Sequence, residues 1–579
     1  MLLQLLRERW RRLRGTGSPA SGGTAQALYR EGVALEERHR FDDAESRYRR
    51  AVELDPDFAK AHNNLGVLLE FRGCDAEAAD CYRRAAAVDP ALPQPRVNFG
   101  NLLRRTGDLD AAVENYRVAL ALDLANVEAQ DNLGNVLLER GEHAAARAAH
   151  LLAAQLAPDS EVVASNLLSC DNYSAIVSPR DKFLAHVAWG RKFAEPLAAV
   201  FEPWTNLPEP GRRLRIGYVS PDFRLHAMSY FIEPLLQLAD PRAFELFCYS
   251  NWHRTDAVTA RFRTLVPHWR DIAAMGDDDV VRLIRQDEID LLVDLAGHTS
   301  GSRLLVFARK PAPVQLTFMG YVNTTGVSAI DFRITDAVAD PPGLSESRYT
   351  ERQLRLPVSL FGYRPPDDAP AVGALPALAN GFPTFGSFNN LAKITSAVIE
   401  TWAQLLVRSP EARLIMFGVP QGETQRRLRA SFAGHGVDPA RLELQVRTGF
   451  ADFLRAHNRV DIALDPYPFN GGATTCHALW MGVPTVTLAG DVFAGRTGLS
   501  LLNAIGLPEL AASDENGYIE VAAALAADLP RLGALRAGLR ERMRNSPVGD
   551  LPRFVAAMEK LYRGAWQDWC ARQTPGSAG

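Results

Sequence analysis

One spacing, of 34 residues, constrains the first third of this chain more than any other feature of the sequence. Glycine, alanine and tyrosine keep this spacing together, at Gly32, Gly66, Gly100 and Gly134, at Ala44, Ala78, Ala112 and Ala146, at Ala51, Ala85, Ala119 and Ala153, and at Tyr48, Tyr82 and Tyr116. His150 takes the fourth tyrosine place, and Leu124 takes the place of a proline found at Pro56, Pro90 and Pro158. Small residues allow helices to cross closely, the tyrosine fills the space between them, and the proline ends the second helix. The period therefore predicts a stack of helix pairs over residues 24–160.

The repeat resembles the tetratricopeptide repeat, whose period is 34 residues and whose unit is a helix pair, so an α-helical superhelix is expected. A ladder of asparagines runs at the same period, at Asn64, Asn98, Asn132 and Asn166. In such a stack the first helix of each pair lines a concave groove, and an amide there both donates to and accepts from a peptide backbone. We interpret the ladder as a sequence-tolerant clamp for an extended acceptor chain. The alternative is that each amide bonds a neighbouring helix end.

Composition limits the classes of function that are open to the chain. Its 579 residues carry 64 basic and 68 acidic side chains, and the net charge of −4 argues against a strongly basic nucleic-acid binder. No stretch reaches the ~18 apolar residues of a membrane span. Six cysteines without a CxxC pair argue against a disulfide framework or a structural zinc site and favour a reducing, cytoplasmic location. Residues 1–23 are expected to form a short amphipathic or frayed extension, with a weak membrane-surface helix as the alternative.

From Arg213 onward, the pattern of apolar and polar residues changes. Short apolar runs separated by helix-like stretches follow, in the order RLRIGYVS, FELFCYS, IDLLVDLAG, VQLTFMGY and DFRITD. After a Pro-rich stretch, a second series runs TFGSFNN, RLIMFG, LELQV, DIALDP and TVTLAG. Apolar runs of this length suit strands buried on both faces of a parallel sheet. We predict two Rossmann-like α/β lobes facing a cleft, with a helical connection over 161–210, a first lobe over 211–365, a linker over 366–381, a second lobe over 382–570 and a tail over 571–579.

Polar and basic residues follow the predicted strands of both lobes, where open α/β sheets bind their ligands. His226 follows the first strand, His298 and Thr299 follow the third, and Asn390 and Lys393 follow the first strand of the second lobe. His226 is a candidate general base or phosphate donor, or else a satisfied loop histidine. Lys393 is a candidate point charge on a diphosphate, or else a solvated surface lysine.

The most informative segment is FNGGATTCHALWMGVP, which follows a predicted strand and opens a predicted helix. Asn470 is interpreted as the N-cap, and Gly471 and Gly472 remove side chains where a ligand approaches the backbone. Thr474 and Thr475 add hydroxyls to the first helical turn. Free N–H groups and the helix dipole make such a turn an anion site suited to phosphate. The alternative is an ordinary strand-to-helix turn.

The sequence gives little reason to expect a metal. The acidic run Asp277–Asp279 is typical of a helix N-terminus, and Cys476 and His477 point in different directions on the predicted helix. The motifs of P-loops, zinc proteases, dinucleotide-binding turns and nucleophile elbows are all missing from the sequence. We therefore expect neither a metal nor another cofactor.

Several long stretches in order carry a family resemblance, including LRIGYVSPDFRLHAMSYF, LLVDLAGHTSGSRLLVFARKPAPVQLTFMGYVNTTG, GSFNNLAKI and LDPYPFNGGATTCHALWMGVPTVTL. From about residue 24 to residue 570 the chain resembles the O-linked N-acetylglucosamine transferase family, bacterial branch, in which tetratricopeptide repeats are fused to a GT-B glycosyltransferase of family 41 type. The resemblance implies an inverting, metal-independent transfer of a sugar, N-acetylglucosamine, from a UDP-sugar to a serine or threonine hydroxyl of a protein.

The resemblance also implies roles for individual residues. It places His226 as the active-site histidine, a base or an orienting group, and Lys393 as the lysine that neutralises the diphosphate. Its remaining assignments are the nucleotide contact Asn390, the diphosphate hydroxyls Thr474 and Thr475, and the sugar-facing His298, Thr299 and Gly320.

Two positions depart from the family pattern. His477 stands where the family usually has an aspartate that accepts bonds from the ribose hydroxyls, and Ala473 stands where some relatives have a histidine. Both departures concern the nucleotide rather than the diphosphate. They keep two alternatives open: a transferase for another nucleotide sugar (glucose, or GDP-fucose as in a plant relative), and a repeat-based adaptor whose catalytic half has lost activity.

Overall fold

The computed structural model describes residues 24–198 and 203–573, and it divides the chain into two compact units. One unit is built on residues 24–163, and the other on residues 164–419 and 425–573. The predicted extension over residues 1–23 and most of the predicted tail lie outside the described residues.

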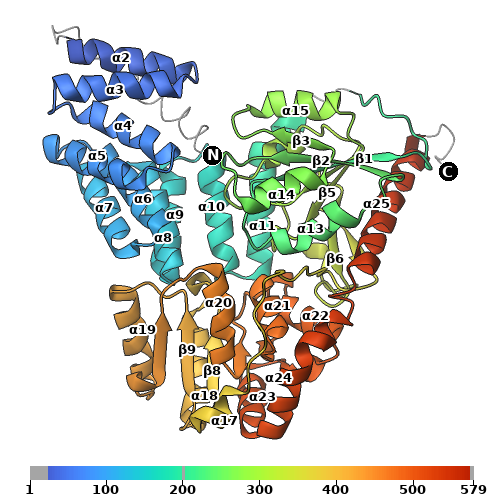
Figure 1. The fold of residues 1–579 in the computed structure, drawn as a ribbon. Coiled ribbons are helices and arrows are strands. Elements are labelled where there is room, and N and C mark those ends of the chain that lie inside the picture. Colours follow the sequence, from blue (N-terminus) through green and yellow to red (C-terminus); the bar gives the residue numbers. More distant parts are fainter. Residues whose placement is uncertain (1–23, 199–202, 574–579) are drawn as a thin grey trace. The chain divides into compact units, whose positions relative to one another are not determined.

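The first unit consists of antiparallel helix pairs, as the 34-residue period predicts (Figure 1). Its helices are α2 (Thr24–Glu37), α3 (Phe41–Leu54), α4 (Ala59–Phe71), α5 (Asp75–Val88), α6 (Gln94–Thr106), α7 (Leu109–Leu122), α8 (Val127–Glu139) and α9 (His143–Leu156). A further helix, α10 (Glu161–Asn172), crosses the boundary between the units.

The glycine ladder and the tyrosine ladder of the repeat pack directly against each other. A β-carbon added at Gly32, Gly66 or Gly100 would lie only 2.5–2.7 Å from a ring carbon of the tyrosine sixteen residues later. In the fourth repeat the partner of Gly134 is His150, whose Nδ1 is 2.8 Å from Asp131 Oδ1. The glycines are therefore required for close helix crossing, and in the fourth repeat a histidine fills the tyrosine's place with an aspartate bonded to its Nδ1.

We expect Gly66→Ala to destabilise the repeat unit by about 1–3 kcal/mol, because its new methyl group would overlap the Tyr82 ring. The change is measured as a shift in the free energy of urea-induced unfolding, followed by far-UV circular dichroism. Gly564→Ala is the matched control, since Gly564 is also helical and has no atom within 4 Å of its added carbon. Equal stability of Gly66→Ala and the wild type would show that the two helices can separate enough to accommodate the methyl group.

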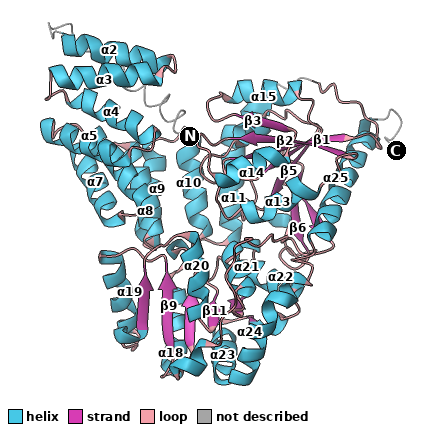
Figure 2. Cartoon of the chain, in the orientation of Figure 1, coloured by secondary structure: helices cyan, strands magenta, loops and turns pink. Residues whose placement is uncertain are grey.

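The second unit contains two parallel sheets flanked by helices (Figure 2). The first sheet has the order β3-β2-β1-β4-β5-β6-β7, and the second has the order β10-β9-β8-β11-β12-β13. The strands of the first are β1 (Leu214–Ser220), β2 (Phe244–Ser250), β3 (His268–Asp271), β4 (Leu291–Asp294), β5 (Val314–Phe318), β6 (Phe332–Asp336) and β7 (Arg352–Leu356). Those of the second are β8 (Thr384–Ser387), β9 (Arg413–Phe417), β10 (Leu442–Gln445), β11 (Ile462–Leu464), β12 (Thr485–Leu488) and β13 (Ala511–Ala512). The two-lobed Rossmann-like fold is thus confirmed.

The helices of the second unit follow the strands in alternation, as a doubly wound fold requires. Those before and within the first lobe are α11 (Pro179–Trp189), η1 (Gly190–Ala194), α12 (Glu195–Ala198), α13 (Ser229–Leu238), α14 (Ala257–Leu265), α15 (Asp277–Gln286), α16 (Leu304–Ala308) and η2 (Glu346–Arg348). Later in the chain come α17 (Pro376–Asn380), η3 (Leu391–Lys393), α18 (Ser396–Arg408), α19 (Glu423–Gly434), η4 (Pro439–Arg441), α20 (Phe450–Ala456), η5 (His457–Arg459), α21 (Ala473–Trp480), η6 (Phe493–Gly495), α22 (Thr497–Ala504), η7 (Pro508–Leu510), α23 (Glu515–Ala527), α24 (Leu529–Arg544) and α25 (Leu551–Gln573).

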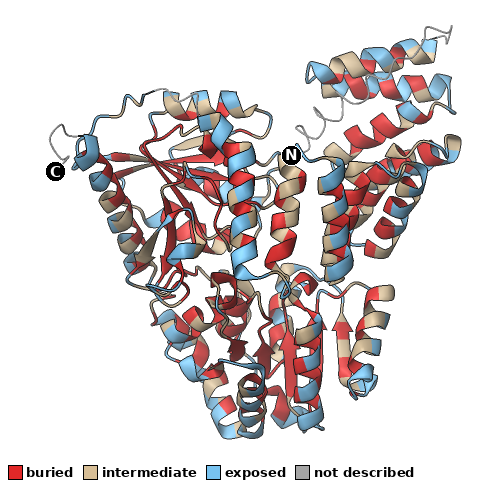
Figure 3. Ribbon diagram, turned by 180° about the vertical axis from the view of Figure 1, so that it is seen from behind, coloured by how far each residue is buried: buried red, intermediate tan, exposed pale blue. Residues whose placement is uncertain are grey.

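All ten strands that the apolar runs predict are present, and three further strands were not predicted. The central strands are buried on both faces, which is why they stand out in the sequence (Figure 3). The additional strands β3, β7 and β13 lie at the sheet edges. Strands β3 and β7 are partly exposed and β13 has only two residues, so none of them has an apolar run.

The last helix, α25, corrects the predicted extent of the second lobe. Residues 551–570 were assigned to that lobe, but α25 packs along the first sheet. Its Tyr562 hydroxyl lies 3.3 Å from that of Tyr218 in β1, and Glu559 accepts a 2.7 Å bond from the Asp240 amide. Because the helix returns from the far end of the second lobe, no local pattern in its sequence predicts its partner.

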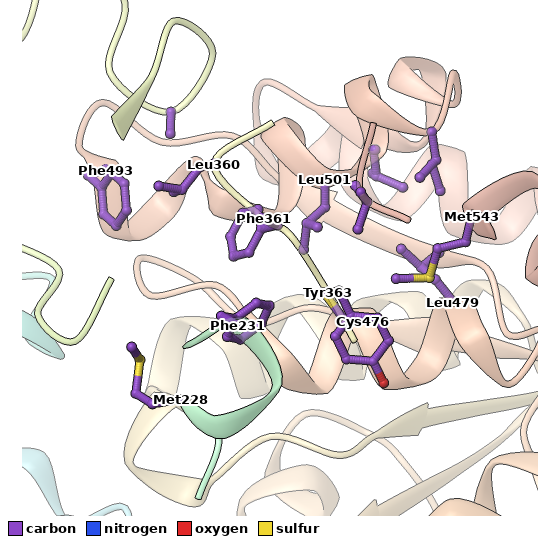
Figure 4. Packing of buried hydrophobic residues seen from close by; sticks show 14 of the residues in the cluster. Met228, Phe231, Leu360, Phe361, Tyr363, Cys476, Leu479, Phe493, Leu501 and Met543 are labelled. Atoms are coloured by element: carbon purple, nitrogen blue, oxygen red, sulfur yellow. The ribbon is translucent and has the colours of Figure 1, made fainter. Parts of the chain in front are cut away.

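A continuous apolar core joins the two lobes. Phe361 and Tyr363, from the segment that connects the sheets, are almost fully buried among residues of both lobes. Figure 4 shows Tyr363 between Phe231 of α13 and Leu479 of α21, with Phe361 beside Phe231. The start of the connection is therefore packed into the core, whereas residues 366–374 of the predicted linker are partly or fully exposed.

Candidate active site

The strand order places the polar residues of both lobes at equivalent points. In each sheet the order reverses between the first strand and the fourth, β1 and β4 in one lobe, β8 and β11 in the other. A crevice opens at such a point beyond the carboxyl ends of the strands. His226 follows β1, Lys393 follows β8, and the glycine-rich turn follows β11. The sequence-predicted candidates thus come from the strands that flank the two crevices.

Lys393 lies at the end of η3 with its ammonium held by neutral groups. Its Nζ donates a 2.6 Å hydrogen bond to the carbonyl of Asn470 and lies 4.3 Å from the centre of the Phe469 ring. The Tyr173 ring stacks on Phe469 at 4.9 Å and 10°. Burial lowers the pKa of Lys393 to about 8, and the nearby charge of Asp465 opposes that shift. The side chain is therefore a positioned cation beside the glycine-rich turn, not a solvated surface lysine.

The glycine-rich turn presents an uncapped helix N-terminus. Gly472, not Asn470, occupies the N-cap of α21, and no side chain caps the helix. The predicted cap was wrong because the Asn470 amide bonds elsewhere, donating to the Pro466 carbonyl at 2.9 Å. The first N–H groups of a helix have no partner within it. At Gly471 an added β-carbon would lie 2.4 Å from the Thr475 hydroxyl, so glycine alone fits here.

Asp465 is a site residue that the sequence analysis missed. It directly follows β11, is fully buried, and accepts hydrogen bonds from the Gly471 N–H (2.6 Å) and the Thr487 hydroxyl (2.7 Å). Burial raises its pKa to about 6, while these bonds and the charge of Lys393 oppose the shift. Asp465 therefore holds the turn in shape and provides negative charge near the ammonium. Asp465 follows a strand just as Lys393 does, so its position was a usable signal. The run DIALDP, however, was interpreted only as a strand.

Thr474 joins the two segments of the second crevice. Its hydroxyl donates a 2.9 Å bond to Asn389, the residue that precedes the predicted nucleotide contact. Asn390 itself is exposed, and its side-chain oxygen accepts from the Ala392 N–H at 3.0 Å as the cap of η3. Asn389, Lys393 and the turn are thus brought together, with the Asn390 oxygen already used by the backbone.

His477 lies on α21 inside an aromatic enclosure. Its ring makes edge contacts with Tyr230 at 4.8 Å, Phe450 at 5.4 Å and Tyr363 at 5.6 Å. The Tyr363 hydroxyl is 2.7 Å from Nδ1, and burial lowers the pKa of His477 to about 3. The imidazole is therefore neutral at physiological pH. Tyr230 comes from α13 of the first lobe, so this enclosure spans both lobes.

Tyr363→Phe should lower stability by about 1–3 kcal/mol, because it leaves a buried nitrogen of His477 without its partner. The measurement is a double-mutant cycle on the free energy of unfolding. Because the double variant Tyr363→Phe with His477→Phe removes both polar partners, we expect it to recover part of the loss. Strictly additive effects would show that the two groups are not coupled.

His226 lies in the loop between β1 and α13, with its side chain 37% exposed. Its Nδ1 is 3.5 Å from Asp222 Oδ2 and 3.3 Å from the Met228 amide nitrogen, which donates to it. Burial lowers the pKa of His226; the Asp222 carboxylate opposes this and Arg224 adds to it. The neutral ring is the form that accepts a proton. While Nδ1 accepts from Met228, the single proton of the neutral ring is on Nε2; in the other tautomer, with the proton on Nδ1 towards Asp222, Nε2 is the free acceptor.

The three predicted sugar-facing residues occupy different environments. His298 is buried in the core, with Nε2 donating to the Thr325 carbonyl at 2.7 Å and Nδ1 3.0 Å from the Ser165 hydroxyl. This corrects the prediction for His298, because neither ring nitrogen is left for a ligand. The half-buried Thr299 donates to the Ala296 carbonyl at 2.8 Å. A β-carbon at Gly320 would overlap the Leu295 carbonyl oxygen at 1.8 Å, so this glycine lets the loops that follow β5 and β4 approach each other closely.

Two rungs of the asparagine ladder are buried inside the repeats. Asn64 and Asn98 are only 6% and 2% exposed. The Asn64 amide donates to the Tyr48 hydroxyl at 3.4 Å, and the Asn98 amide donates to Asn63 at 2.7 Å. These amides therefore bond other side chains of the stack. This corrects the predicted clamp at both positions, since a buried amide satisfied in this way does not face a peptide.

The other two rungs are half-buried, Asn132 on α8 and Asn166 on α10. Asn132 is half-buried and donates to Asn101 at 2.8 Å. Asn166 lies on α10 in the other structural unit. The 34-residue spacing thus marks a repeated packing position at Asn64, Asn98 and Asn132, whose amides bond other side chains rather than the neighbouring helix ends of the alternative interpretation.

Across residues 24–198 and 203–573, no three His, Cys, Asp or Glu side chains gather as a metal site would require. Within the same part of the chain, every helix is too short or too polar to cross a bilayer.

Relatives of known class match both parts of the chain. The sequence profile of glycosyl transferase family 41 matches residues 198–362 and 375–558, and tetratricopeptide repeat profiles match residues 29–93 and 100–141. The solved structure of a mutant O-GlcNAc transferase from Thermobaculum terrenum superposes with a TM-score of 0.82 at 36% identity, covering 96% of this chain and 100% of that one.

Two plant proteins described as probable UDP-N-acetylglucosamine–peptide N-acetylglucosaminyltransferases are also similar. SPINDLY of Petunia hybrida is 41% identical over 425 residues, and SEC of Arabidopsis thaliana is 31% identical over 433 residues. The alignments cover 72% and 71% of this chain but only 45% and 44% of those proteins. The chain thus spans less than half the length of these relatives.

Two Rossmann-like lobes with polar residues at both crevices define a GT-B glycosyltransferase fold, here joined to tetratricopeptide repeats. The chain belongs to glycosyl transferase family 41.

Proposed function

We propose that this protein transfers a sugar from a UDP-sugar, N-acetylglucosamine in the first instance, to serine or threonine hydroxyls of proteins, with inversion and without a metal. The observation that carries the proposal is the pairing of a partly buried lysine with an uncapped helix N-terminus. The Lys393 ammonium bonds the carbonyl that directly precedes the glycine pair at the start of α21. A diphosphate placed there meets a cation, backbone N–H groups and threonine hydroxyls at once.

The leaving group determines what the second lobe must do. When the bond between the anomeric carbon and the diphosphate breaks, the electron pair leaves with the nucleoside diphosphate. Lys393, the first-turn N–H groups of α21 and the Thr474 and Thr475 hydroxyls are proposed to stabilise that charge. They act in a site where Asp465 already fixes the turn, so little reorganisation is needed during the reaction.

The acceptor hydroxyl must lose a proton as its oxygen attacks. The oxygen forms the new bond on the face of the anomeric carbon opposite the diphosphate, which inverts the configuration. We assign the proton to His226, whose ring is neutral because burial lowers its pKa. Asp222 is proposed to hold the ring in the tautomer whose free nitrogen faces the acceptor.

The proposal has a competing alternative for the identity of the donor sugar and its nucleotide. Both plant relatives are described as probable UDP-N-acetylglucosamine transferases. His477, neutral and enclosed by aromatic rings, offers no carboxylate to a ribose. The environment of His477 is the observation that favours testing donors other than UDP-N-acetylglucosamine, GDP-sugars among them.

The acceptor is proposed to be a protein, because tetratricopeptide stacks bind extended polypeptides along their inner surface. With Asn64 and Asn98 buried, such binding must use other side chains of the inner helices. Because the repeats and both lobes are retained together, an adaptor without activity remains the second candidate. The enclosed His477 is the observation that favours it.

The test is release of nucleoside diphosphate from a panel of UDP- and GDP-sugars, in the presence of a serine-containing protein acceptor, with and without chelator. One donor turned over equally with and without chelator is the expected result. Release that needs a divalent cation would overturn the metal-free mechanism. Absence of release with every donor, together with retained binding of protein ligands, would favour the adaptor.

A further inference from the structure

A polar cavity of about 180 Å³ lies beside the proposed diphosphate site, which is formed by Lys393 and the glycine-rich turn at the start of α21 and is called the diphosphate cradle below. The cavity is not part of the proposed catalytic or nucleotide-binding site. Lys182, Asn323, Asp340, Arg348 and Arg496 contribute its polar lining, and Val322, Leu344 and Phe493 contribute apolar wall. Its lining comes from both lobes and from α11. The cavity is large enough for a group of several heavy atoms rather than for a single water.

The cavity adjoins the cradle through adjacent residues of α10 and its C-terminal loop. Asn172 lines the cavity and accepts a 3.0 Å bond from Asn323. The next residue, Tyr173, stacks on Phe469, whose ring also contacts the ammonium of Lys393. Neither Lys393 nor Thr474 lines the cavity itself, so it is a separate space one residue away from the proposed cradle.

Its three cationic side chains donate to backbone carbonyls and make no ion pair within the described residues. Lys182 is 8% exposed and donates to the Ser174 carbonyl at 2.8 Å. Arg348 donates to the Asp491 carbonyl, and Arg496 donates to those of Val338 and Gly490. An ammonium has three donors and a guanidinium has five, so most of their hydrogen-bonding capacity is unused.

The carboxylates of the cavity do not use this capacity. Asp340 accepts from the Thr335 and Tyr349 hydroxyls, at 2.7 and 2.9 Å, and lies 3.9 Å from Arg333. Asp491 is exposed, and Asp171, outside the lining, acts on Lys182 only through its charge. The cavity is therefore rich in donors and poor in acceptors. Because an unpaired buried cation such as Lys182 is costly, and Arg348 and Arg496 beside it are only partly exposed, such a space favours a ligand that brings anionic oxygens.

We propose that this cavity is a second binding site, distinct from the diphosphate cradle, for a carboxylate or phosphate group carried on a small apolar body. The anionic oxygens bond Lys182, Arg348 and Arg496, and the apolar body packs on Val322 and Phe493. The group comes either from a free small molecule or from an acidic side chain beside the acceptor hydroxyl. The proposal does not depend on the donor or on the transfer reaction.

Calorimetric titration of the whole chain with glutarate and with inorganic phosphate, without nucleotide, tests the site. We expect saturable binding of at least one probe, weakened at least 10-fold in Lys182→Met and in Arg348→Met. Methionine keeps an unbranched, flexible stem and removes the charge. Arg408→Met, on the exposed face of α18, is the control and should bind as the wild type does. Arg348→Met carries the test if the buried Lys182→Met variant does not fold.

Two further measurements separate this site from the proposed function and identify its source. UDP binding should be unchanged in Arg348→Met, because that side chain does not line the cradle. Serine peptides with glutamate beside the acceptor should displace the probe, and their glutamine counterparts should not, if the anion belongs to the acceptor. Displacement by neither, with the probe still bound, assigns the site to a small molecule. Absence of saturable binding, or equal affinity in all variants, would overturn the proposal.

Discussion

Lys393→Ala should lower kcat/KM for sugar transfer by about 10²- to 10³-fold, the loss typical of removing one preorganised charge-stabilising group. The variant loses the only ammonium that bonds the glycine-rich turn in the described structure. Nucleotide release measured at saturating acceptor gives the effect. Lys560→Ala, an exposed lysine on α25, serves as the control and should retain full activity.

The same lysine sets the alkaline side of the pH profile. Burial lowers its pKa to about 8, so raising the pH through 8 removes the ammonium charge from the free enzyme. We therefore expect kcat/KM to fall above pH 8, since kcat/KM reports ionisations of the free enzyme. Bound diphosphate favours the charged form and should shift the corresponding fall in kcat to higher pH. A profile that is flat between pH 7 and 10 would remove Lys393 from the mechanism.

His226→Ala should lower kcat by about 10²- to 10⁴-fold, the range expected for loss of a general base. The control is His435→Ala, an exposed histidine in the second lobe. Because burial lowers the pKa of His226, the neutral base persists to a pH below 6.5 and activity should fall only below that value. The acid limb distinguishes two roles, because a histidine that only donates a hydrogen bond still does so when protonated. An unchanged acid limb in His226→Ala would show that another group accepts the proton.

The parts of the fold that the sequence predicted well have their cause in local pattern. Each central strand is buried on both faces and therefore appears as an apolar run, and each repeat glycine recurs because its own tyrosine lies against it. Edge strands such as β7, in which only the last of five residues is buried, lack that pattern. The partner of α25 depends on the path of the chain through a whole lobe, which no window of sequence contains.

The candidate site residues divide in the same way, into features that local sequence predicts and features that it does not. Lys393 and the glycine-rich turn were predicted because residues that follow strands meet at one edge of a sheet. His298 obeyed the same rule, yet its ring turned into the core towards Ser165 and Thr325. Asn98 was placed correctly in the repeat, but its neighbour Asn63 took its amide. The sequence indicates which residues reach a region; only packing decides which way a side chain turns.

The position of α25 has a consequence for the order in which the protein is made. Tyr562 and Trp566 are buried with the residues of the first lobe, and the Trp566 indole donates to the Glu209 carbonyl at 3.0 Å. The ribosome therefore releases the strands of that lobe long before it supplies the helix that covers them. During that interval the first lobe has an uncovered apolar flank, which is the kind of surface that chaperones bind.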